Sequence, residues 1–369
     1  MHKIAQKMSR LAIHILHELY HLVKTYYGLK SVCVALIIIY FLFTKNILQR
    51  KSQLSQTCPA VRAPMFHSKI GLKVFALNVW GMPEFLGSED KFLRMNAIGQ
   101  LVAKAEYDLY LLSELWLRSD HQIIKSWLPS GLFMTEIADF SLPSCDGFIS
   151  PWDCSGLAIV SRYPFLETEF VPFTETGDWS SLDGEFWAQK GAGRVRIEPS
   201  EGFITDVFVT HTCADGPSYS NEYYRQKQAE QVSQEVKASD ADFVIVGGDL
   251  NAIQASKETT YSELERVLIN SFHGPLVTLT KYHSSDKATY GNPHNSYSWR
   301  SQPAVYDYIW YRARQGNIIW STFTDVLVIK TEKYDTADNH DRYDTTENHE
   351  ISLSDHEAVI VYLNMLKLF

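Results

Sequence analysis

Cysteine is scarce in this sequence, and the few cysteines form neither a metal-binding nor a disulfide pattern. Five cysteines are spread over 369 residues, and no pair has the Cys-x-x-Cys spacing of a structural zinc site. Cys145 and Cys154 are near enough to pair across a loop in an oxidising compartment, but the low total favours free thiols, which we expect. The sequence also has no Asn-x-Ser/Thr sequon that would indicate a secreted protein.

Positive charge is scarce outside the N-terminal segment. Residues 1–51 carry eight Lys and Arg against one acidic residue, whereas residues 52–369 carry 26 against 42. A nucleic-acid-binding groove normally needs a basic face, so we expect no nucleic-acid partner for this acidic body. A single phosphate bound through a divalent cation remains compatible with the charge.

A Gly-rich dinucleotide loop and a repeat of fixed period are also absent, which argues against a doubly wound dinucleotide-binding sheet. With 45% apolar residues and nine tryptophans, the chain can bury a large core. Strand patterns outnumber helical ones from residue 70 onward, which favours an α/β (α+β) fold of packed sheets flanked by helices. Strands are expected at 72–79, 108–116, 156–161, 167–173, 193–198, 203–211, 242–247, 304–312, 322–330 and 356–363, and helices at 90–106, 221–238 and 257–269.

One long apolar run lies near the N-terminus. Residues 31–44 correspond to about 20 Å of helix, which is short for a bilayer core of about 30 Å. A signal-peptide core has this length, but the basic segment after Thr44 is a poor cleavage site. We therefore expect an uncleaved membrane anchor at 31–44, followed by a linker at 45–69 and one domain at 70–369.

Residues 1–30 show helical spacing of apolar side chains, with basic side chains elsewhere on the helical wheel. This pattern is typical of an amphipathic helix on an anionic membrane surface, and a helix packed on the body is the alternative. We expect a membrane protein with a single-pass or interfacial N-terminal anchor. The side of the membrane, the organelle and the oligomeric state stay open.

Polar side chains close several of the expected strands. An apolar run at 244–246 is followed by two glycines, and we expect these glycines to let the backbone turn tightly before Asp249 and Asn251. The pattern of an apolar strand closed by a polar residue recurs at Asn78, Glu114, His211, Asp307, Asp355 and His356. Because buried carboxylates need partners that offset their desolvation, so many in one domain indicate a shared site.

The residue types at these strand ends indicate a hard metal ion. Carboxylate and amide oxygens without a cysteine cluster suit Mg²⁺, Mn²⁺ or Ca²⁺ better than zinc. Glu114 is the strongest candidate ligand, with Asn78 beside it, and a strand-end salt bridge is the alternative for Glu114. His211 and His356 are candidates for a general base toward water and for stabilising phosphate charge.

Together these motifs resemble the endonuclease/exonuclease/phosphatase superfamily, which has the DNase-I-like fold. The resemblance runs from about 70 to 365 and rests on Asn78, Glu114, Gly-Asp-Leu-Asn at 248–251, Asp307 and Ser-Asp-His at 354–356. Within that superfamily, the segments at 77–83, 184–191, 210–214 and 224–227 are similar to neutral sphingomyelinases. The superfamily implies a four-layer sandwich of two packed mixed β-sheets flanked by helices, here with an N-terminal membrane helix.

The resemblance also implies roles for the site residues. Glu114, Asn78 and Asp355 would bind Mg²⁺, for which Mn²⁺ is a substitute. The catalytic residues would be His356, Asp249, Asn251, His211 and Asp307: His356 accepts the proton of the attacking water, Asp249 and Asn251 position water and phosphate, His211 steadies the phosphoryl oxygens, and Asp307 orients an imidazole. Whether Asp249 or His356 takes the proton stays open. Lys190 and Arg225 are candidate phosphate-binding or structural cations.

The implied reaction is Mg²⁺-dependent hydrolysis of sphingomyelin to ceramide and phosphocholine in a catalytic domain at 70–369. The N-terminal segments favour a membrane lipid as substrate, because they would deliver the domain to a bilayer. A first alternative is an enzyme of the same fold that acts on a lysophospholipid, an inositol phosphate or DNA. A second alternative is a membrane-tethered binding protein whose active site has lost its activity. The intact set of polar residues at the strand ends argues against it.

Overall fold

The computed structural model describes residues 69–142, 145, 154–178, 184–186, 188–215, 220–253, 259–270, 288–297, 302–331 and 350–367. The expected amphipathic segment, membrane anchor and all but the last residue of the linker lie outside these ranges. Within them, no helix has the length and apolar character that crossing a bilayer requires. The first strand begins at Lys69, one residue before the expected start of the domain.

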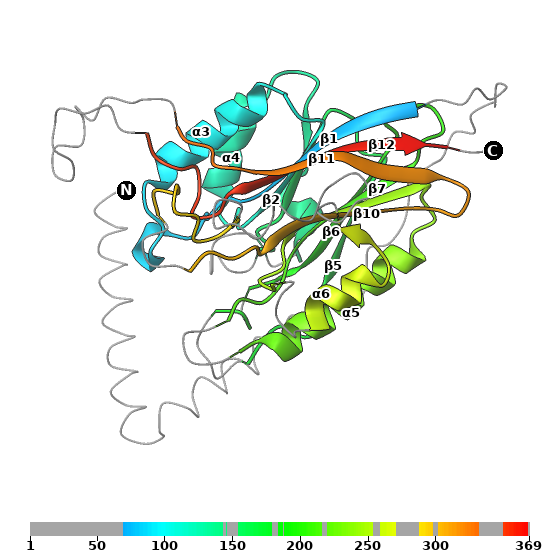
Figure 1. Ribbon diagram of the computed structural model, residues 1–369. Helices are drawn as coiled ribbons and strands as arrows, with labels where there is room; N and C mark the ends of the chain where they lie inside the picture. The colour runs from blue at the N-terminus through cyan, green and yellow to red at the C-terminus, as the bar shows by residue number, and fades with distance from the viewer. Residues whose placement is uncertain are drawn as a thin grey trace, which may run out of the picture. The chain divides into compact units, whose positions relative to one another are not determined.

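Two six-stranded sheets form the centre of the described body (Figure 1). Across the first sheet the order is β11 (Ile318–Leu327), β12 (Ala358–Leu366), β1 (Lys69–Asn78), β2 (Leu109–Ser113), β4 (Ala158–Ser161) and β3 (Phe133–Met134). Across the second sheet it is β5 (Glu167–Pro172), β6 (Gly191–Ile197), β7 (Thr205–His211), β8 (Phe243–Asp249), β10 (Asp307–Ala313) and β9 (Ile269–Asn270). Each sheet is mixed, because one central pair is parallel, β1 with β2 and β7 with β8, while the other pairs are antiparallel.

Helices cover the outer faces of both sheets (Figure 1). Buried residues of α3 (Lys91–Ala103) and α4 (Arg118–Trp127) join one core cluster with β1, β2 and β4. Residues of α5 (Glu222–Ala238) and α6 (Thr259–Glu265) join the core of the second sheet. Two short 3₁₀ helices, η1 (Glu84–Leu86) and η2 (Ile137–Phe140), lie in connections. The four layers confirm the sandwich that the sequence predicted.

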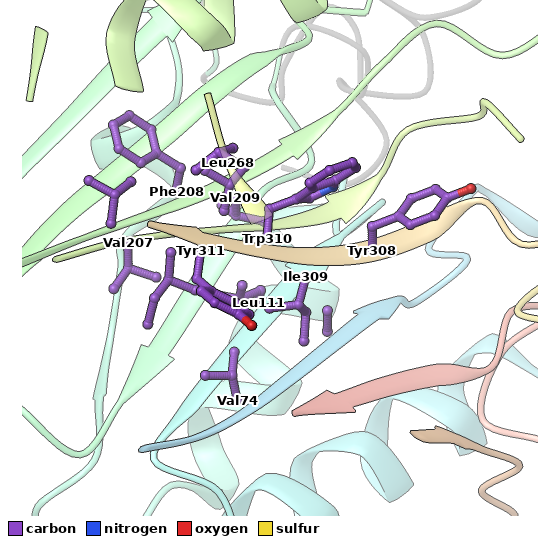
Figure 2. Close-up of a cluster of buried hydrophobic side chains, with 14 of the residues drawn as sticks. Val74, Leu111, Val207, Phe208, Val209, Leu268, Tyr308, Ile309, Trp310 and Tyr311 are labelled. Atoms are coloured by element: carbon purple, nitrogen blue, oxygen red, sulfur yellow. The ribbon is translucent and has the colours of Figure 1, made fainter. Parts of the chain in front are cut away.

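Alternation of side chains along β1 explains how one strand serves two cores. Val74 and Ala76 belong to the cluster between the sheets, whereas Phe75 and Leu77 belong to the cluster under α3 and α4. Successive side chains of a strand point to opposite faces. A strand that is apolar at every position is therefore covered by other elements on both faces. Figure 2 shows Val74 on the side of β10 from which Ile309 projects, while Trp310 extends from its other face.

The helix α4 was not expected from the sequence. Its ten residues contain only three large apolar side chains, Ile123, Ile124 and Trp127, so the helical period is weakly marked. Ile124 is nevertheless fully buried against the first sheet. Packing, rather than local pattern, therefore decides this helix.

The expectation of free thiols at Cys145 and Cys154 is wrong. The two residues form a disulfide, and their Cα atoms are 4.9 Å apart. This separation lies within the range that a disulfide spans, although the sequence separation of nine residues alone did not reveal the approach. Cys213 is a free, buried cysteine.

The expectation of a tight turn at the two glycines of β8 is also wrong. The strand continues through Gly247 and Gly248 to Asp249, and the chain turns later, at Asn251, where φ is +47°. A Cβ on Gly248, which has φ +140°, would lie 1.9 Å from the carbonyl oxygen of Thr210 in the neighbouring strand. Glycine is thus required by close approach of two backbones. The extension carries Asp249 to the edge of the sheet.

Candidate active site

Three of the predicted polar strand ends lie side by side on the second sheet. Asp249 closes β8 and is in register with His211, which closes the parallel strand β7. Asp249 is also in register with Asp307, which opens the antiparallel strand β10. The order of the strands therefore places these three side chains in one row at one edge of the sheet.

The first sheet contributes the other half of the site. Asn78 closes β1, and Glu114 follows β2 with φ +60°. Asp355 and His356 precede β12, which pairs with β1 on its other side. Gly81 donates its backbone N–H to the carbonyl oxygen of Glu114 at 3.0 Å. A Cβ at Gly81 would lie 2.2 Å from that oxygen, so a side chain there would displace Glu114.

Two contacts join the first sheet to the second: Asn78 with Asp249, and His356 with Asp307. The side-chain nitrogen of Asn78 donates to Glu114 Oε1 at 2.9 Å and to Asp249 Oδ2 at 3.0 Å. The His356 Nδ1 lies 2.7 Å from Asp307 Oδ2. The Asn78 oxygen accepts from the backbone N–H of Trp80 at 2.9 Å. Asn78 therefore bridges two carboxylates here, and its expected role as a metal ligand stays a prediction.

His356 is surrounded by negative charge. Its Nε2 lies 3.7 Å from Asp249 Oδ2, and the Tyr290 ring packs against the imidazole at 4.9 Å between centroids. Burial lowers the pKa of His356, but the carboxylates of Asp307 and Asp249 outweigh burial and raise it well above 6.5. Asp307 fixes the orientation of the ring and the position of its Nδ1 proton.

His211 is a neutral imidazole in this environment. Burial, together with the Lys190 ammonium, lowers the pKa of His211 to about 3. Its Nε2 faces the donors Asn251 Nδ2 at 3.1 Å and Lys190 Nζ at 3.3 Å, so the ring carries its proton on Nδ1. Among the described residues, Nδ1 has no hydrogen-bond partner. His211 therefore brings no positive charge toward a phosphate.

The two predicted cations are held by protein groups. Lys190 Nζ, which is buried, contacts the Glu185 carboxylate at 2.8 Å, the Thr212 carbonyl oxygen at 2.9 Å and His211 Nε2. These three partners match the three N–H donors of an ammonium, which favours the structural alternative for Lys190. Arg225, on α5, donates to Cys213 O at 3.1 Å and to Asp215 Oδ1 at 2.7 Å, and so ties down the loop after β7.

Replacing Lys190 with methionine is expected to raise the pKa of His211. The methionine keeps most of the volume but removes the charge that opposes protonation, while burial still holds the pKa below 6.5. Because Glu185 loses its ion pair with Lys190, the variant should also lose about 3 kcal/mol of unfolding free energy. Imidazole NMR titration and urea unfolding check both effects. Lys227→Met, which removes a half-buried helix lysine paired with Glu230, is the control. An unchanged His211 titration in Lys190→Met would contradict this arrangement.

The predicted residues open onto one cleft of about 410 Å³. Its lining includes seven of them: Glu114, Lys190, His211, Asp249, Asn251, Asp355 and His356. Asn78 and Asp307 stand behind this lining and are hydrogen-bonded to it, whereas Arg225 is not part of it. Aromatic side chains that the sequence did not single out as site residues complete the wall: Trp80, Trp116 and Tyr306.

The carboxylates of the cleft fit a hard divalent cation. Burial, and then repulsion from Asp355, raises the pKa of Glu114 to about 7, so its negative charge is poorly compensated by the protein. Among the described residues, the His, Cys, Asp and Glu donor atoms that cluster within 4.8 Å are those of Asp249, Asp307 and His356. His356 and Asp307 of this cluster are hydrogen-bonded to each other, which suits them to proton transfer. Glu114 and Asp355 are then the oxygen donors that fit Mg²⁺.

Arg94 was not singled out in the sequence, because no motif marks it as part of a site. It lies four residues before Ile98 on α3 and is fully buried, with hydrogen bonds to the loop after β1 and to the loop before β12. The available signal was its position on the apolar face of a predicted helix, since residues four apart share a face. A basic residue there more often extends its stem along the core and keeps its charge in solvent.

Part of the sequence is similar to named proteins from two organisms. Sphingomyelin phosphodiesterase 2 from Homo sapiens is 28% identical over 185 residues, which cover 49% of this chain and 41% of the human protein. Inositol phosphosphingolipids phospholipase C from Schizosaccharomyces pombe is 28% identical over 185 residues, with the same coverage of 49% and 41%. The matched segment thus spans about two fifths of the length of these relatives.

The fold is also found among solved structures. A mutant of beta toxin from Staphylococcus aureus with bound magnesium ions superposes with a TM-score of 0.60 at 20% identity, over 79% of this chain and 99% of the toxin chain. The model of the Endonuclease/Exonuclease/phosphatase family matches residues 76–356, which is more than half of the sequence. This stretch includes every predicted site residue, from Asn78 to His356. The chain therefore belongs to the Endonuclease/Exonuclease/phosphatase family.

Proposed function

We propose that this protein is a metal-dependent phosphodiesterase that hydrolyses sphingomyelin to ceramide and phosphocholine at a membrane. The observation that carries the reaction type is the buried His356–Asp307 pair, with a 2.7 Å contact, beside a cleft of carboxylates. The names of the relatives support the lipid class. The body is too acidic for a nucleic-acid groove, which favours a lipid over the DNA alternative.

Glu114 and Asp355 would hold Mg²⁺, or Mn²⁺ in its place, with Asn78 orienting Glu114 through its amide. The bound cation supplies positive charge for the phosphoryl oxygens and lowers the pKa of nearby acidic and imidazole groups. Magnesium commonly takes one or two carboxylates together with water and phosphate oxygens, which suits this pair. The bound magnesium of the beta toxin relative supports this choice of ion.

His356 would accept a proton from the attacking water while Asp307 keeps Nδ1 protonated and the ring in place. The water oxygen forms a bond to phosphorus, and the bond from phosphorus to the ceramide oxygen breaks. His356 then returns the proton to that leaving oxygen, so charge and atoms balance. Asn251 donates to His211 Nε2, and its backbone N–H donates to Asp249 Oδ1 at 2.8 Å, which fixes both residues at the floor of the cleft.

Asp249 is the alternative base. The neighbouring His356, with hydrogen bonds from Asn251 and Asn78, overcomes burial and lowers the pKa of Asp249, so Asp249 is a weak acceptor of protons. Because Asp249 is a weak base and the pKa of the neighbouring His356 is raised, His356 is favoured over Asp249 as the residue that carries the proton. Asp249 would then stabilise the imidazolium across their 3.7 Å separation.

Release of phosphocholine from sphingomyelin tests the proposal directly. The full chain in mixed detergent micelles is expected to release phosphocholine with Mg²⁺, to lose at least about 100-fold of this rate in EDTA, and to recover with added Mg²⁺ or Mn²⁺. The effect follows because the phosphoryl charge is then left without its cation. Mass spectrometry of ceramide identifies the bond that breaks.

Other outcomes separate the alternatives. Turnover of a lysophospholipid, an inositol phosphosphingolipid or DNA, without turnover of sphingomyelin, would keep the phosphodiesterase and overturn the substrate. Mg²⁺-dependent binding of sphingomyelin vesicles without any hydrolysis would favour the binding-protein alternative. No release of phosphocholine with either metal would overturn the proposed function.

A further inference from the structure

We propose that Arg94 is a positioning residue of the cleft, which holds the loop after β1 and the loop before β12 in one fixed arrangement. Its five hydrogen bonds go to none of the side chains to which we assign proton or metal chemistry, although its charge acts to lower the pKa of Asp355, which burial raises. It acts through the backbone on both sides of them. The consequence for turnover rests on the proposed function, whereas the consequence for geometry does not.

Every N–H donor of the Arg94 guanidinium has a partner. An arginine side chain has five such donors in a rigid planar fork. Nε donates to Glu89 O at 2.7 Å, Nη1 to Val79 O at 2.8 Å and Leu353 O at 3.2 Å, and Nη2 to Trp80 O at 3.0 Å and Ser88 Oγ at 2.6 Å. All five acceptors are uncharged, and four of them are backbone carbonyls.

The guanidinium also packs against two aromatic rings that contact each other. Its central carbon is 4.7 Å from the centroid of the Trp80 ring and 5.9 Å from that of Tyr297. Trp80, with φ +48°, lines the cleft, and its ring contacts Tyr297 at 5.0 Å. Arg94 therefore fixes both the backbone and the side chain of Trp80.

Two of the acceptors of Arg94 lie close in sequence to residues of the site. Val79 directly follows Asn78, and Leu353 comes two residues before Asp355 and three before His356. One nitrogen, Nη1, binds both carbonyls. The two loops are thus held at a separation set by one rigid group, although 259 residues separate Arg94 from Leu353.

A fully buried cation is costly, and apolar packing at this position would often be as stable. At this position the planar guanidinium of Arg94 binds five acceptors with its five donors in fixed directions. Lysine has three donors on a flexible stem and cannot reproduce this geometry. The observations therefore favour positioning over simple packing.

Arg94→Met and Arg94→Lys in the full chain test the inference, with Arg312→Met as the matched control. Arg312 also binds backbone carbonyls, those of Val236 and Ser239, but it lies five residues along β10 from Asp307 and away from the cleft. On bis(p-nitrophenyl) phosphate with Mg²⁺, Arg94→Met is expected to lose about 100-fold in kcat with KM within about twofold. Arg94→Lys should lose less, and Arg312→Met should lower Tm while keeping kcat.

Imidazole NMR of the same three variants reports geometry without turnover. The signals of His356, assigned with His356→Gln, should shift in Arg94→Met and stay in place in Arg312→Met. If the unaltered protein cleaves no phosphodiester, the proposed function fails and these signals alone decide the role of Arg94. A folded Arg94→Met protein with unchanged His356 signals, or with unchanged kcat in an active enzyme, would overturn the inference.

Discussion

Glu114→Gln is expected to lower the proposed Mg²⁺-dependent turnover by about 1,000-fold or more, because glutamine keeps the shape of the side chain but not the charge proposed to hold the cation. The same variant should raise the Tm of the EDTA-treated protein. Burial, and then repulsion from Asp355, raises the pKa of Glu114 from 4.5 to about 7, so the ionised carboxylate opposes folding in the metal-free state.

The pH dependence of this stabilisation follows from the direction of the shift. Above about pH 7 Glu114 is ionised in the folded and unfolded states, and its full penalty is present. As the pH falls toward 4.5 the folded state takes up the proton first, and the penalty disappears. The Tm gain of Glu114→Gln should therefore be largest above pH 7 and vanish near pH 4.5.

Turnover with Mg²⁺ and thermal unfolding in EDTA across this pH range measure both effects. Glu201→Gln is the control, because Glu201 is exposed in the turn before β7, at the end of the strand opposite to His211. It should alter neither quantity. A Glu114→Gln protein with normal Mg²⁺-dependent turnover would remove Glu114 from the metal site.

His356→Gln is expected to lower kcat by about 100- to 10,000-fold, which is the usual contribution of a general base. The variant keeps a polar side chain of similar length but has no group that can accept the proton. Asp307→Asn should be nearly as damaging, because the amide no longer holds Nδ1 protonated and the ring in place. Since the two residues act as a unit, the double variant should be little worse than His356→Gln.

Turnover of the three variants with saturating Mg²⁺ measures these losses. His121→Gln is the matched control: His121 is a buried histidine whose Nε2 lies 2.8 Å from the carbonyl oxygen of Thr135, outside the lining of the cleft. It should lower Tm and leave kcat unchanged. A His356→Gln protein that retains a third or more of normal kcat would exclude His356 as the base and favour Asp249.

The two-sheet architecture could be predicted because strands leave a strong local pattern. The strand pattern at 203–211 corresponds to β7 at Thr205–His211, and the polar residue that closes it was visible in the sequence. Neighbouring strand ends meet at one edge of a sheet, so a list of such ends already outlines a site. The glycines of β8 were misinterpreted because a tight turn and a close approach between two strands both require glycine, and the sequence alone does not separate them.

Other features depend on contacts that no local pattern records. The disulfide of Cys145 and Cys154 depends on how closely the two Cα atoms approach in space. The short helix α4 has too few apolar residues to show its period. Arg94 is recognisable only once the carbonyls that surround it are in place.

The sequence by itself predicted the described strands apart from the two-residue β3 and β9, predicted the polar residues that close them and indicated a hard cation, because these follow from side-chain periodicity and ligand type. Only the tertiary structure decided the pairs: Asn78 with Asp249, 171 residues apart, and His356 with Asp307, 49 residues apart. It also decided that the pKa of His211 is lowered while that of His356 is raised. Hydrogen bonds and pKa values depend on distance and burial in space, and the fold alone sets both.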